Sequence, residues 1–577
     1  MTNATEAETY QDVRAWLRGL ADRFLSAPDL NTVDDLANAI SQHLEGRSAG
    51  WFSPLDPLFA QALRDRRQSQ DPVQPNGGRV WWERDDDAPT AAMPPMTTHA
   101  TPKVVEDVDG DLSDLIPSQR FVADQILDWL VTGKINGREE SQGILMGYAG
   151  MGKTYMAGAI AAVAIKNGMV DPREVILVAP SHQARKVIRR MFSGRGLHLD
   201  TCTFAGLLGL TPEIDPDTGE EVYKPGEYTP KITGKTLVIG DEASQWSHRL
   251  QSYLDQQSQS DVQVLWMGDD AQLPPVESRR DRPTDQLNLL EPELPNESPL
   301  FDLPGWQLTE VVRYSGAIAL LANDIRQNLS CPRLPLAEIR YYAQQDQTVD
   351  LLNLQDWHKV MIAAFKYGDI EDSPDQFRVL AWRNKRVAEI NAAIHTARYG
   401  DNADPYCPGE VIIARRPCTI AMPNDNRNRL TLLHNGEQAV VIDAKRATVE
   451  GLSVWWLDCR KEPDDNGLTR VTLQVIDQCS AEDLDRRLKV LAEKAKAERD
   501  PSLRKRAWVN YYELKNQFHD VSLAYALTVH KSQGSTFGQV FVDLADIGCN
   551  RRDIKERNRM IYTAITRCSQ QSILMHP

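Results

Sequence analysis

The sequence predicts an α/β fold of two units with parallel sheets, a small β-barrel inserted into the second unit, and a helical extension at the N-terminus. Short apolar runs rich in β-branched residues alternate with helical stretches from residue 113 onward, as expected of parallel sheets covered by helices. A second set of such runs begins near residue 377. Between the two sets, residues 408–477 contain short strand-like runs and Asn435-Gly436, a strong hairpin signal.

The order of these patterns predicts the domain organisation. Residues 1–67 show helical spacing of apolar residues, and residues 68–112 are rich in Pro, Asp and Gly, as in a linker. A charged helical run over 481–518 is expected to support the barrel or to contact a partner. The remaining expected boundaries are 113–310 for the first α/β unit with an insertion at about 207–233, 311–407 and 521–577 for the second unit, and 408–520 for the barrel with its helices.

Composition restricts the class of protein. The chain has 577 residues, with 65 Lys and Arg against 81 Asp and Glu, a formal net charge of −16. There is no apolar run long enough to suggest a membrane span, and no secretory signal is visible. The eight cysteines lack CxxC spacing, which is typical of reduced thiols in a cytosolic protein. Acidic residues are concentrated within 1–110, so the negative total does not exclude a nucleic-acid partner.

Residues 147–154 carry the sharpest chemical signal. They match the pattern G-x-x-x-x-G-K-[ST] between a strand-like run at 143–146 and an Ala-rich helix predicted over 155–167. Glycines let such a loop turn its N–H groups toward phosphates, and the helix N-terminus adds partial positive charge. We expect ATP here, with Lys153 on the β- and γ-phosphates and Thr154 on Mg²⁺. The nucleotide-binding set expected from this segment is Gly147, Gly150, Met151, Gly152, Lys153, Thr154 and Tyr155.

A second segment supplies the acids that such a loop needs. The apolar run at 237–240 ends in Asp241 and Glu242. Asp241 is the candidate Mg²⁺ ligand, together with Thr154, and Glu242 is the candidate base that orients and deprotonates water. The pair therefore favours hydrolysis over transfer to another acceptor.

Further segments resemble the motifs of superfamily 1 helicases, and in particular the 1B branch. They occur in the family's order across roughly residues 113–577. The resemblance does not cover residues 1–110. The matching segments are 115–119 (Q motif), 179–182 (Ia), 201–204 (Ib), 268–276 (III), 308–313 (IV), 377–385, 529–537 (V) and 562–567 (VI).

The resemblance implies two RecA-like units with ATP between them. In that arrangement Gln119 would bind the adenine edge, for which its amide is suited. Gln272 would sense the γ-phosphate or the attacking water, and Gly534 would line the nucleotide. Arg313 and Arg567 would act as arginine fingers from the second unit.

The resemblance also implies movement along single-stranded DNA, with 5′ to 3′ as the expected direction. Such a grip combines phosphate contacts with base stacking. Within the insertion, Asp217-Thr218-Gly219 predicts a hairpin turn and resembles a strand-separating pin, with Tyr223 or Tyr228 at the fork. The other candidate DNA contacts are Pro180, His182, Thr203 and Phe204 on the first unit and Asn384, Thr528, His530 and Lys531 on the second.

Several functions stay open at this stage. The main expectation is an ATP-dependent DNA helicase acting on single-stranded, forked or partial-duplex DNA in the cytoplasm of a bacterial or phage-infected cell. A translocase that displaces proteins but unwinds weakly, an RNA helicase and a P-loop switch that ignores nucleic acid are the alternatives. The N-terminal extension is expected to recruit a single-strand-binding, replication or recombination protein, or to shield the DNA channel.

Overall fold

The computed structural model describes residues 111–214, 221–226, 229–257, 262–275, 297–310, 316–422, 425–463 and 467–576. The chain divides into two units, Met1–His99 and Ala100–Pro577, and the described residues all belong to the second. The predicted N-terminal helices and linker, the turn at 217–219, Tyr228 and Arg313 lie outside the described residues.

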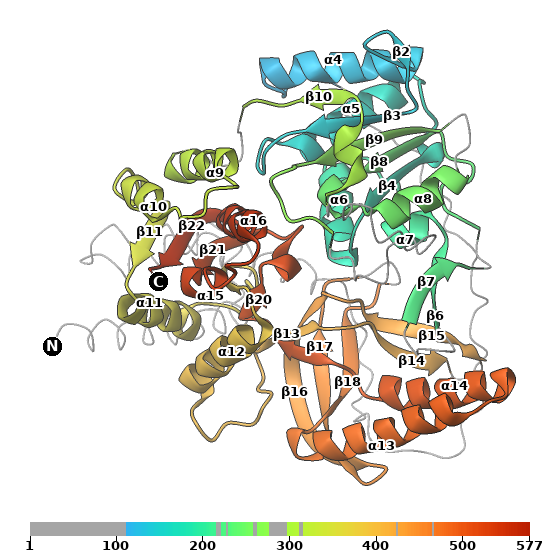
Figure 1. The fold of residues 1–577 in the computed structure, drawn as a ribbon, viewed down its shortest axis with the longest axis vertical. Helices are drawn as coiled ribbons and strands as arrows, with labels where there is room; N and C mark the ends of the chain where they lie inside the picture. Colours follow the sequence, from blue (N-terminus) through green and yellow to red (C-terminus); the bar gives the residue numbers. More distant parts are fainter. Residues whose placement is uncertain are drawn as a thin grey trace, which may run out of the picture. The chain divides into compact units, whose positions relative to one another are not determined.

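The first lobe is a parallel six-stranded sheet with helices on both faces (Figure 1). Its strand order is β10-β3-β9-β8-β4-β5. Residues alternate between two cores: one face packs on α4, α5 and α6, and the other on α7 and α8. The strands are β3 (Gln142–Met146), β4 (Val175–Ala179), β5 (Asp200–Thr203), β8 (Leu237–Gly240), β9 (Gln263–Gly268) and β10 (Gly305–Gln307), and the helices are α4 (Pro117–Thr132), α5 (Lys153–Lys166), α6 (His182–Ser193), α7 (Phe204–Leu207) and α8 (His248–Gln257).

Two small hairpins are attached to this lobe. β1 (Lys134–Ile135) pairs with β2 (Arg138–Glu139) directly after α4. β6 (Leu210–Ile214) pairs antiparallel with β7 (Glu221–Pro225) within the predicted insertion. The second pair brackets residues 215–220, so its strands flank the predicted turn.

The second lobe is a parallel five-stranded sheet in the order β11-β22-β21-β12-β20 (Figure 1). Its core includes Trp357, Phe365 and Phe541, each 1% exposed or less. The elements are β11 (Val349–Leu352), β12 (Phe377–Ala381), β20 (Ala526–Thr528), β21 (Phe537–Val542) and β22 (Cys568–Met575), with α9 (Ala317–Gln327), α10 (Leu336–Ala343), α11 (Leu354–Tyr367), α12 (Asn384–Tyr399), α15 (Leu544–Ile547) and α16 (Ile554–Ile565). The α/β class with two parallel sheets is therefore confirmed.

The insert is an antiparallel sheet in the order β18-β17-β16-β13-β19, with a separate β14–β15 hairpin. Its two helices pack on each other through Ala495, Trp508 and Tyr512. The observed strand order is open, and the SH3-like barrel stays a prediction. The elements are β13 (Val411–Ala414), β14 (Cys418–Met422), β15 (Asp425–Leu433), β16 (Gln438–Val449), β17 (Leu452–Arg460), β18 (Arg470–Ile476), β19 (Val521–Leu523), α13 (Gln478–Ala497) and α14 (Pro501–Gln517).

Three local predictions differ from the structure. The run 521–527 is not one strand: β19 joins the insert and β20 joins the second lobe, and the buried residues Ala524 and Tyr525 form a bend between them. Asn435-Gly436 forms a turn, with Gly436 at φ +78°, but it connects β15 and β16, which belong to different sheets. The helix after the phosphate loop begins at Lys153, two residues earlier than expected.

Among the described residues, no helix combines the length and the apolar character needed to cross a lipid bilayer.

Candidate nucleotide site

The phosphate loop connects β3 to α5, and two of its glycines set its shape. Gly150 and Gly152 have φ of +82° and +75°, the left-handed region where a side chain is strained. A Cβ on Gly152 would also lie 3.0 Å from Gln119 Nε2. The loop can therefore present its backbone N–H groups at the start of α5, where helix geometry favours an anion.

Lys153 and Thr154 stand at the start of that helix with defined partners. Lys153 Nζ donates to Gly147 O at 2.7 Å and to Tyr148 O at 3.0 Å. Thr154 Oγ1 donates to Asp241 Oδ2 at 3.0 Å. A hydroxyl beside a carboxylate is the hard oxygen donor set that Mg²⁺ prefers, so these two side chains fit the metal expected here.

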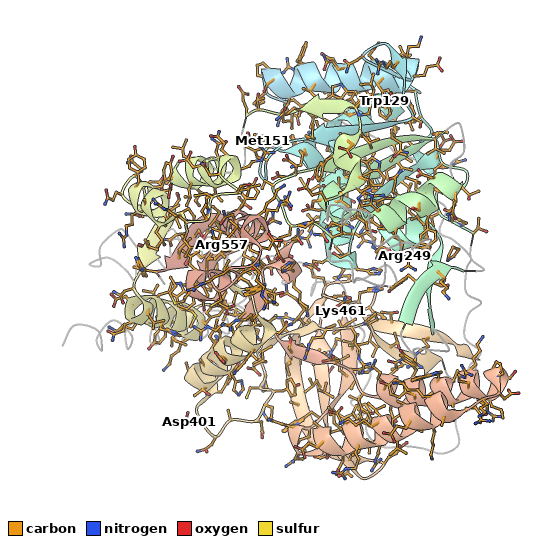
Figure 2. All side chains as sticks on the ribbon, in the orientation of Figure 1. Trp129, Met151, Arg249, Asp401, Lys461 and Arg557 are labelled. Carbon is orange, nitrogen blue, oxygen red and sulfur yellow. The ribbon has the colours of Figure 1, made fainter. Side chains whose placement is uncertain are left out.

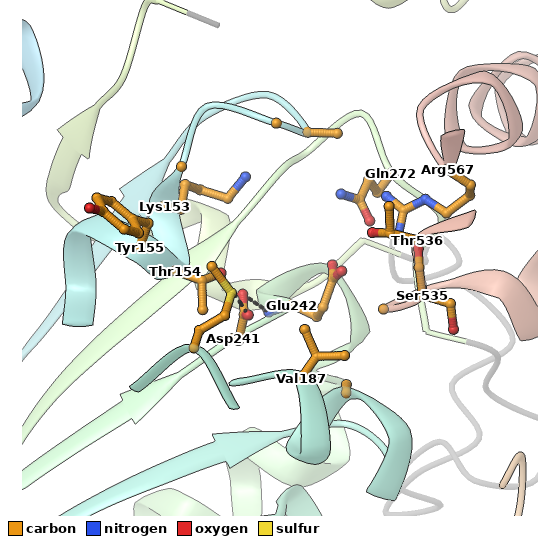
Figure 3. Close-up of a pocket in the computed structure, with 16 residues that line it drawn as sticks. Lys153, Thr154, Tyr155, Val187, Asp241, Glu242, Gln272, Ser535, Thr536 and Arg567 are labelled. Carbon is orange, nitrogen blue, oxygen red and sulfur yellow. Dashed lines mark hydrogen bonds between the residues drawn. The ribbon is translucent and has the colours of Figure 1, made fainter. Parts of the chain in front are cut away.

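Glu242 occupies a strained position next to Asp241. Its backbone is left-handed, with φ 56° and ψ 51°, which costs energy for a residue with a Cβ. The Glu242 N–H donates to Asp241 Oδ1 at 2.9 Å. This turn directs the Glu242 side chain into the hollow in front of Lys153 (Figure 3).

Burial raises the pKa of Glu242 above its ordinary value, although the nearby Arg567 guanidinium acts in the opposite direction. The net shift is upward. A carboxylate with a raised pKa accepts a proton more readily, which suits a base that must deprotonate water.

The second lobe also lines this hollow, which opens to solvent. Arg567 is 5% exposed and lies beside Gln272, facing Glu242 (Figure 3). Gln272 is 4% exposed, and its Oε1 accepts no hydrogen bond from the described residues. A buried acceptor without a hydrogen bond destabilises the folded protein. Here the acceptor borders the hollow, where a bound water molecule could donate to it.

Most of the predicted nucleotide-binding and catalytic residues meet at this hollow. Gly147, Met151 and Gln119 do not line it. Met151 is fully buried, and Gln119 Nε2 donates to Met151 O at 2.8 Å, so in this conformation Gln119 supports the phosphate loop. The predicted residues that line the hollow are Gly150, Gly152, Lys153, Thr154, Tyr155, Asp241, Glu242, Gln272, Gly534 and Arg567.

The sequence pattern missed several lining residues. Ala184, Val187 and Met191 come from α6 and are apolar, so no chemical pattern distinguishes them from core residues. Ser535 and Thr536 directly follow Gly534 and also line the hollow. Their position directly after Gly534, a predicted site residue, was the sequence signal that could have identified them.

Among the predicted DNA contacts on the first lobe, Phe204 stays a prediction, and in this structure its ring is buried. It is 4% exposed, and its ring meets Trp246 at 4.9 Å and Trp266 at 6.2 Å between centroids. Burial in this aromatic cluster removes the face that a base would need. Thr203 Oγ1 accepts a hydrogen bond from Gly206 N at 3.2 Å, so it caps α7.

His182 packs on the insert in this structure. Its ring stacks on His434 with centroids 3.5 Å apart and planes 10° apart. Nearby, Lys186 of α6 pairs with Glu437 at 2.6 Å, and Lys461, labelled in Figure 2, lies 3.6 Å from Glu437. The start of α6 therefore contacts the turn at 434–437.

The remaining DNA candidates lie on surfaces or near loop ends. Pro180 is half-buried and Asn384 is exposed at the start of α12. Tyr223 is 50% exposed on β7, and Arg249 donates to its carbonyl at 2.8 Å (Figure 2).

The last three candidates, Thr528, His530 and Lys531, lie close together in the chain at motif V. Thr528 Oγ1 accepts from Lys531 N at 3.3 Å, and His530 Nε2 lies 3.6 Å from Glu556 Oε1. Burial lowers the pKa of Lys531. Their contact with DNA stays a prediction.

The fold and the site define a P-loop nucleotide-binding protein with two α/β lobes. Comparison with known families gives an AAA domain at residues 133–288 and a UvrD-like helicase C-terminal domain at residues 523–575.

Among curated proteins, the chain is 25% identical over 440 residues to the ATP-dependent DNA helicase dda of Enterobacteria phage T4, covering 73% of this chain and 91% of that protein. It is 22% identical over 515 residues to an uncharacterized protein of Acanthamoeba polyphaga mimivirus, covering 78% of this chain and 98% of that protein. The resemblance to superfamily 1B helicases, and among them to the Dda helicases of T-even phages, is confirmed.

Solved structures similar to this chain include Pif1 helicases. One is a Bacteroides Pif1 in complex with ADP-AlF3 and single-stranded DNA, with 16% identity, a TM-score of 0.42, and coverage of 80% of this chain and 92% of that chain. Another is the Candida albicans Pif1, with 14% identity, a TM-score of 0.40, and coverage of 80% and 94%.

Proposed function

We propose that this chain is an ATP-dependent DNA helicase that moves along single-stranded DNA and unwinds duplex at the expense of Mg-ATP. One observation carries the proposal: the hollow bordered by Lys153 and Glu242 of the first lobe is also bordered by buried Arg567 of the second. A nucleotide bound there would contact both lobes, so hydrolysis would change the contact between them.

The residues of the hollow divide the hydrolytic work. Lys153 exchanges the carbonyls of Gly147 and Tyr148 for phosphate oxygens. Thr154 and Asp241 would hold Mg²⁺, which when bound neutralises phosphate charge. Glu242 takes the proton of the attacking water, and Arg567 stabilises the negative charge that develops on the transferred phosphoryl group. The unsatisfied Oε1 of Gln272 is placed to accept a hydrogen bond from the attacking water, and its Nε2–H₂ group could donate to a phosphate oxygen.

Movement on DNA is proposed from the resemblance together with the position of the candidate contacts. Pro180 precedes α6 and His182 begins it, and α6 lines the nucleotide hollow. Thr528 to Lys531 precede Gly534, which lines the hollow from the second lobe. A change in the hollow would therefore shift both sets of contacts. We propose the 5′ to 3′ direction from the resemblance, and a cytoplasmic location and recruitment of a protein by the N-terminal extension from the sequence.

The decisive experiment measures ATP hydrolysis with and without single-stranded DNA, and then unwinding of partial duplexes with either a 5′ or a 3′ tail. We expect DNA-stimulated hydrolysis, unwinding of the 5′-tailed substrate, and loss of both in Lys153→Ala. Hydrolysis indifferent to DNA would favour a nucleotide switch. Stimulated hydrolysis without unwinding would favour a translocase, and preference for an RNA strand of the same sequence would favour an RNA helicase.

A further inference from the structure

Asp269, in the loop after β9, is a buried carboxylate that the hydrolytic scheme above does not use. It is 1% exposed. Its Oδ2 accepts from Ala149 N at 3.0 Å and from the Tyr562 hydroxyl at 2.5 Å, and its Oδ1 accepts from Ala271 N at 3.1 Å. A buried carboxylate with three donors is an ordered and specific arrangement.

The donors come from elements far apart in the chain. Ala149 belongs to the phosphate loop and lines the nucleotide hollow. Tyr562 belongs to α16, which ends at Ile565, two residues before Arg567. The same carboxylate therefore touches the loop that would hold phosphate and the helix that precedes the candidate arginine finger.

Arg326 of α9 supplies the opposite charge. Its Nε lies 3.5 Å from Asp269 Oδ1, and it also pairs with Asp270. Its guanidinium carbon lies 4.0 Å from the centre of the Tyr148 ring in the phosphate loop. Arg326 thus contacts the loop and the carboxylate together, in a geometry that favours a cation over an aromatic face.

The loop carrying Asp269 is also anchored in the second lobe. Ala271 and Leu273 are buried within the second lobe's core, and Arg559 of α16 donates to Asp270 O at 2.9 Å. Gln272 lies between those anchors. A displacement of Ala149 on phosphate binding would therefore be transmitted directly to α16, because the Asp269 carboxylate is hydrogen-bonded to both Ala149 and Tyr562.

We propose that Asp269, Tyr562 and Arg326 form a relay that positions Arg567 according to the state of the phosphate loop. This inference rests on the proposed function, because it assigns a cause to catalytic closure of the hollow. Tyr562 and Arg326 are positioning residues: they act through Asp269 and Arg567. The Tyr562 hydroxyl is the best place to test the relay. Its removal breaks the hydrogen bond to Asp269 but leaves the aromatic ring, which is 1% exposed, packed in the core.

The test is Tyr562→Phe, compared with Tyr525→Phe as a matched control. Tyr525 is also 1% exposed, and its hydroxyl donates to buried Glu410 at 3.1 Å, away from the nucleotide hollow. Loss of a hydrogen bond to a charged group should lower kcat for ATP by about 10- to 100-fold in Tyr562→Phe. KM for ATP and the binding of a fluorescent ATP analogue should change little, and Tyr525→Phe should keep the wild-type kcat.

A second pair of variants guards against a folding defect. Arg326→Gln removes the charge beside Asp269, and Arg326→Lys keeps it. We expect the Lys variant to recover part of the kcat that the Gln variant loses, at similar thermal unfolding temperatures.

Equal kcat values for Tyr562→Phe and Tyr525→Phe would overturn the relay, as would equal losses for Arg326→Gln and Arg326→Lys. If wild-type hydrolysis ignored DNA, the proposed function would fail. The comparison of basal kcat between the two tyrosine variants would still decide the relay.

Discussion

At the scale of single residues, Glu242 combines a strained backbone with a shifted pKa. Its left-handed φ of 56° places the side chain in the hollow, and burial there raises its pKa above 4.5. Strain retained at such a position is a common feature of functional sites. Glu242 is therefore the residue whose removal should separate nucleotide binding from hydrolysis.

We expect Glu242→Gln to bind ATP normally and to lose about 10²- to 10⁴-fold in kcat. Because the carboxylate is the active form and its pKa is raised, wild-type activity should fall with decreasing pH at a value above 4.5. Rates measured from acid to neutral pH check both points. Two results would exclude Glu242 as the base. One is an unchanged kcat in Glu242→Gln, and the other is residual activity in that variant that falls at acid pH in the same way as wild-type activity.

The predicted site residues that the structure brings together at the hollow have local sequence signals. Lys153, Thr154, Asp241 and Glu242 lie in short motifs between a strand and a helix, and that context defines their geometry. Asp269 lay within a recognised motif, yet its role depends on Tyr562, 293 positions away. A sequence motif covers only residues that are close together in the chain, so it cannot reveal a contact between Asp269 and Tyr562.

Phe204 shows a different limit of sequence motifs: a local pattern predicted a DNA contact at a side chain that the fold buries. An aromatic residue in a DNA-contact motif favours base stacking, but the same property favours burial against Trp246 and Trp266. Only the packing of the first lobe decides between the two outcomes.

At the scale of elements, α6 contacts the insert through a buried ion pair. Lys186 and Glu437 are 8% and 3% exposed, and Lys461 lies on the same carboxylate. Removal of one partner from a buried pair leaves an uncompensated charge. This contact should therefore contribute to the attachment of the insert to the first lobe.

We expect Glu437→Gln to lower the free energy of unfolding by about 3 kcal/mol. The control is Glu462→Gln, which breaks the Arg190–Glu462 pair, 69% and 58% exposed, and should cost less than about 1 kcal/mol. Denaturant unfolding of both variants measures the difference. Equal midpoints would show that the buried pair contributes no more than the surface pair.

The β6–β7 hairpin is the second element with a separate task. Tyr223 is 50% exposed there, and an exposed aromatic ring offers a surface for stacking on a base at a fork. Tyr223→Ala should reduce unwinding several-fold more than it reduces DNA-stimulated hydrolysis. Tyr341→Ala on α10, at a residue 60% exposed, serves as the control, and parallel losses of both activities in Tyr223→Ala would argue against a strand-separating role.

Prediction of strands succeeded where every position is apolar or Gly. The runs at 175–179 and 237–240 form β4 and β8, and every residue in them is buried. Strands β5, β10 and β11 were missed because polar residues interrupt their short runs. The turn at Asn435-Gly436 was located correctly, but its partners depend on sheets that only the tertiary fold defines.

At the scale of the whole molecule, the described unit places a nucleotide hollow where two α/β lobes meet. Residues of both lobes line it, and the loop carrying Gln272 packs into the second lobe's core. Closure of such a site by nucleotide is a direct way to convert hydrolysis into relative motion of the lobes. The claim depends on Arg567 contributing to hydrolysis from the second lobe.

The most direct measurement is steady-state ATP hydrolysis of wild type and Arg567→Ala at saturating single-stranded DNA, with ATP affinity measured in parallel. An arginine that stabilises phosphoryl transfer contributes about 10³- to 10⁵-fold. We predict a loss of that order in Arg567→Ala while ATP still binds. Turnover at the wild-type rate would contradict a nucleotide site completed by the second lobe.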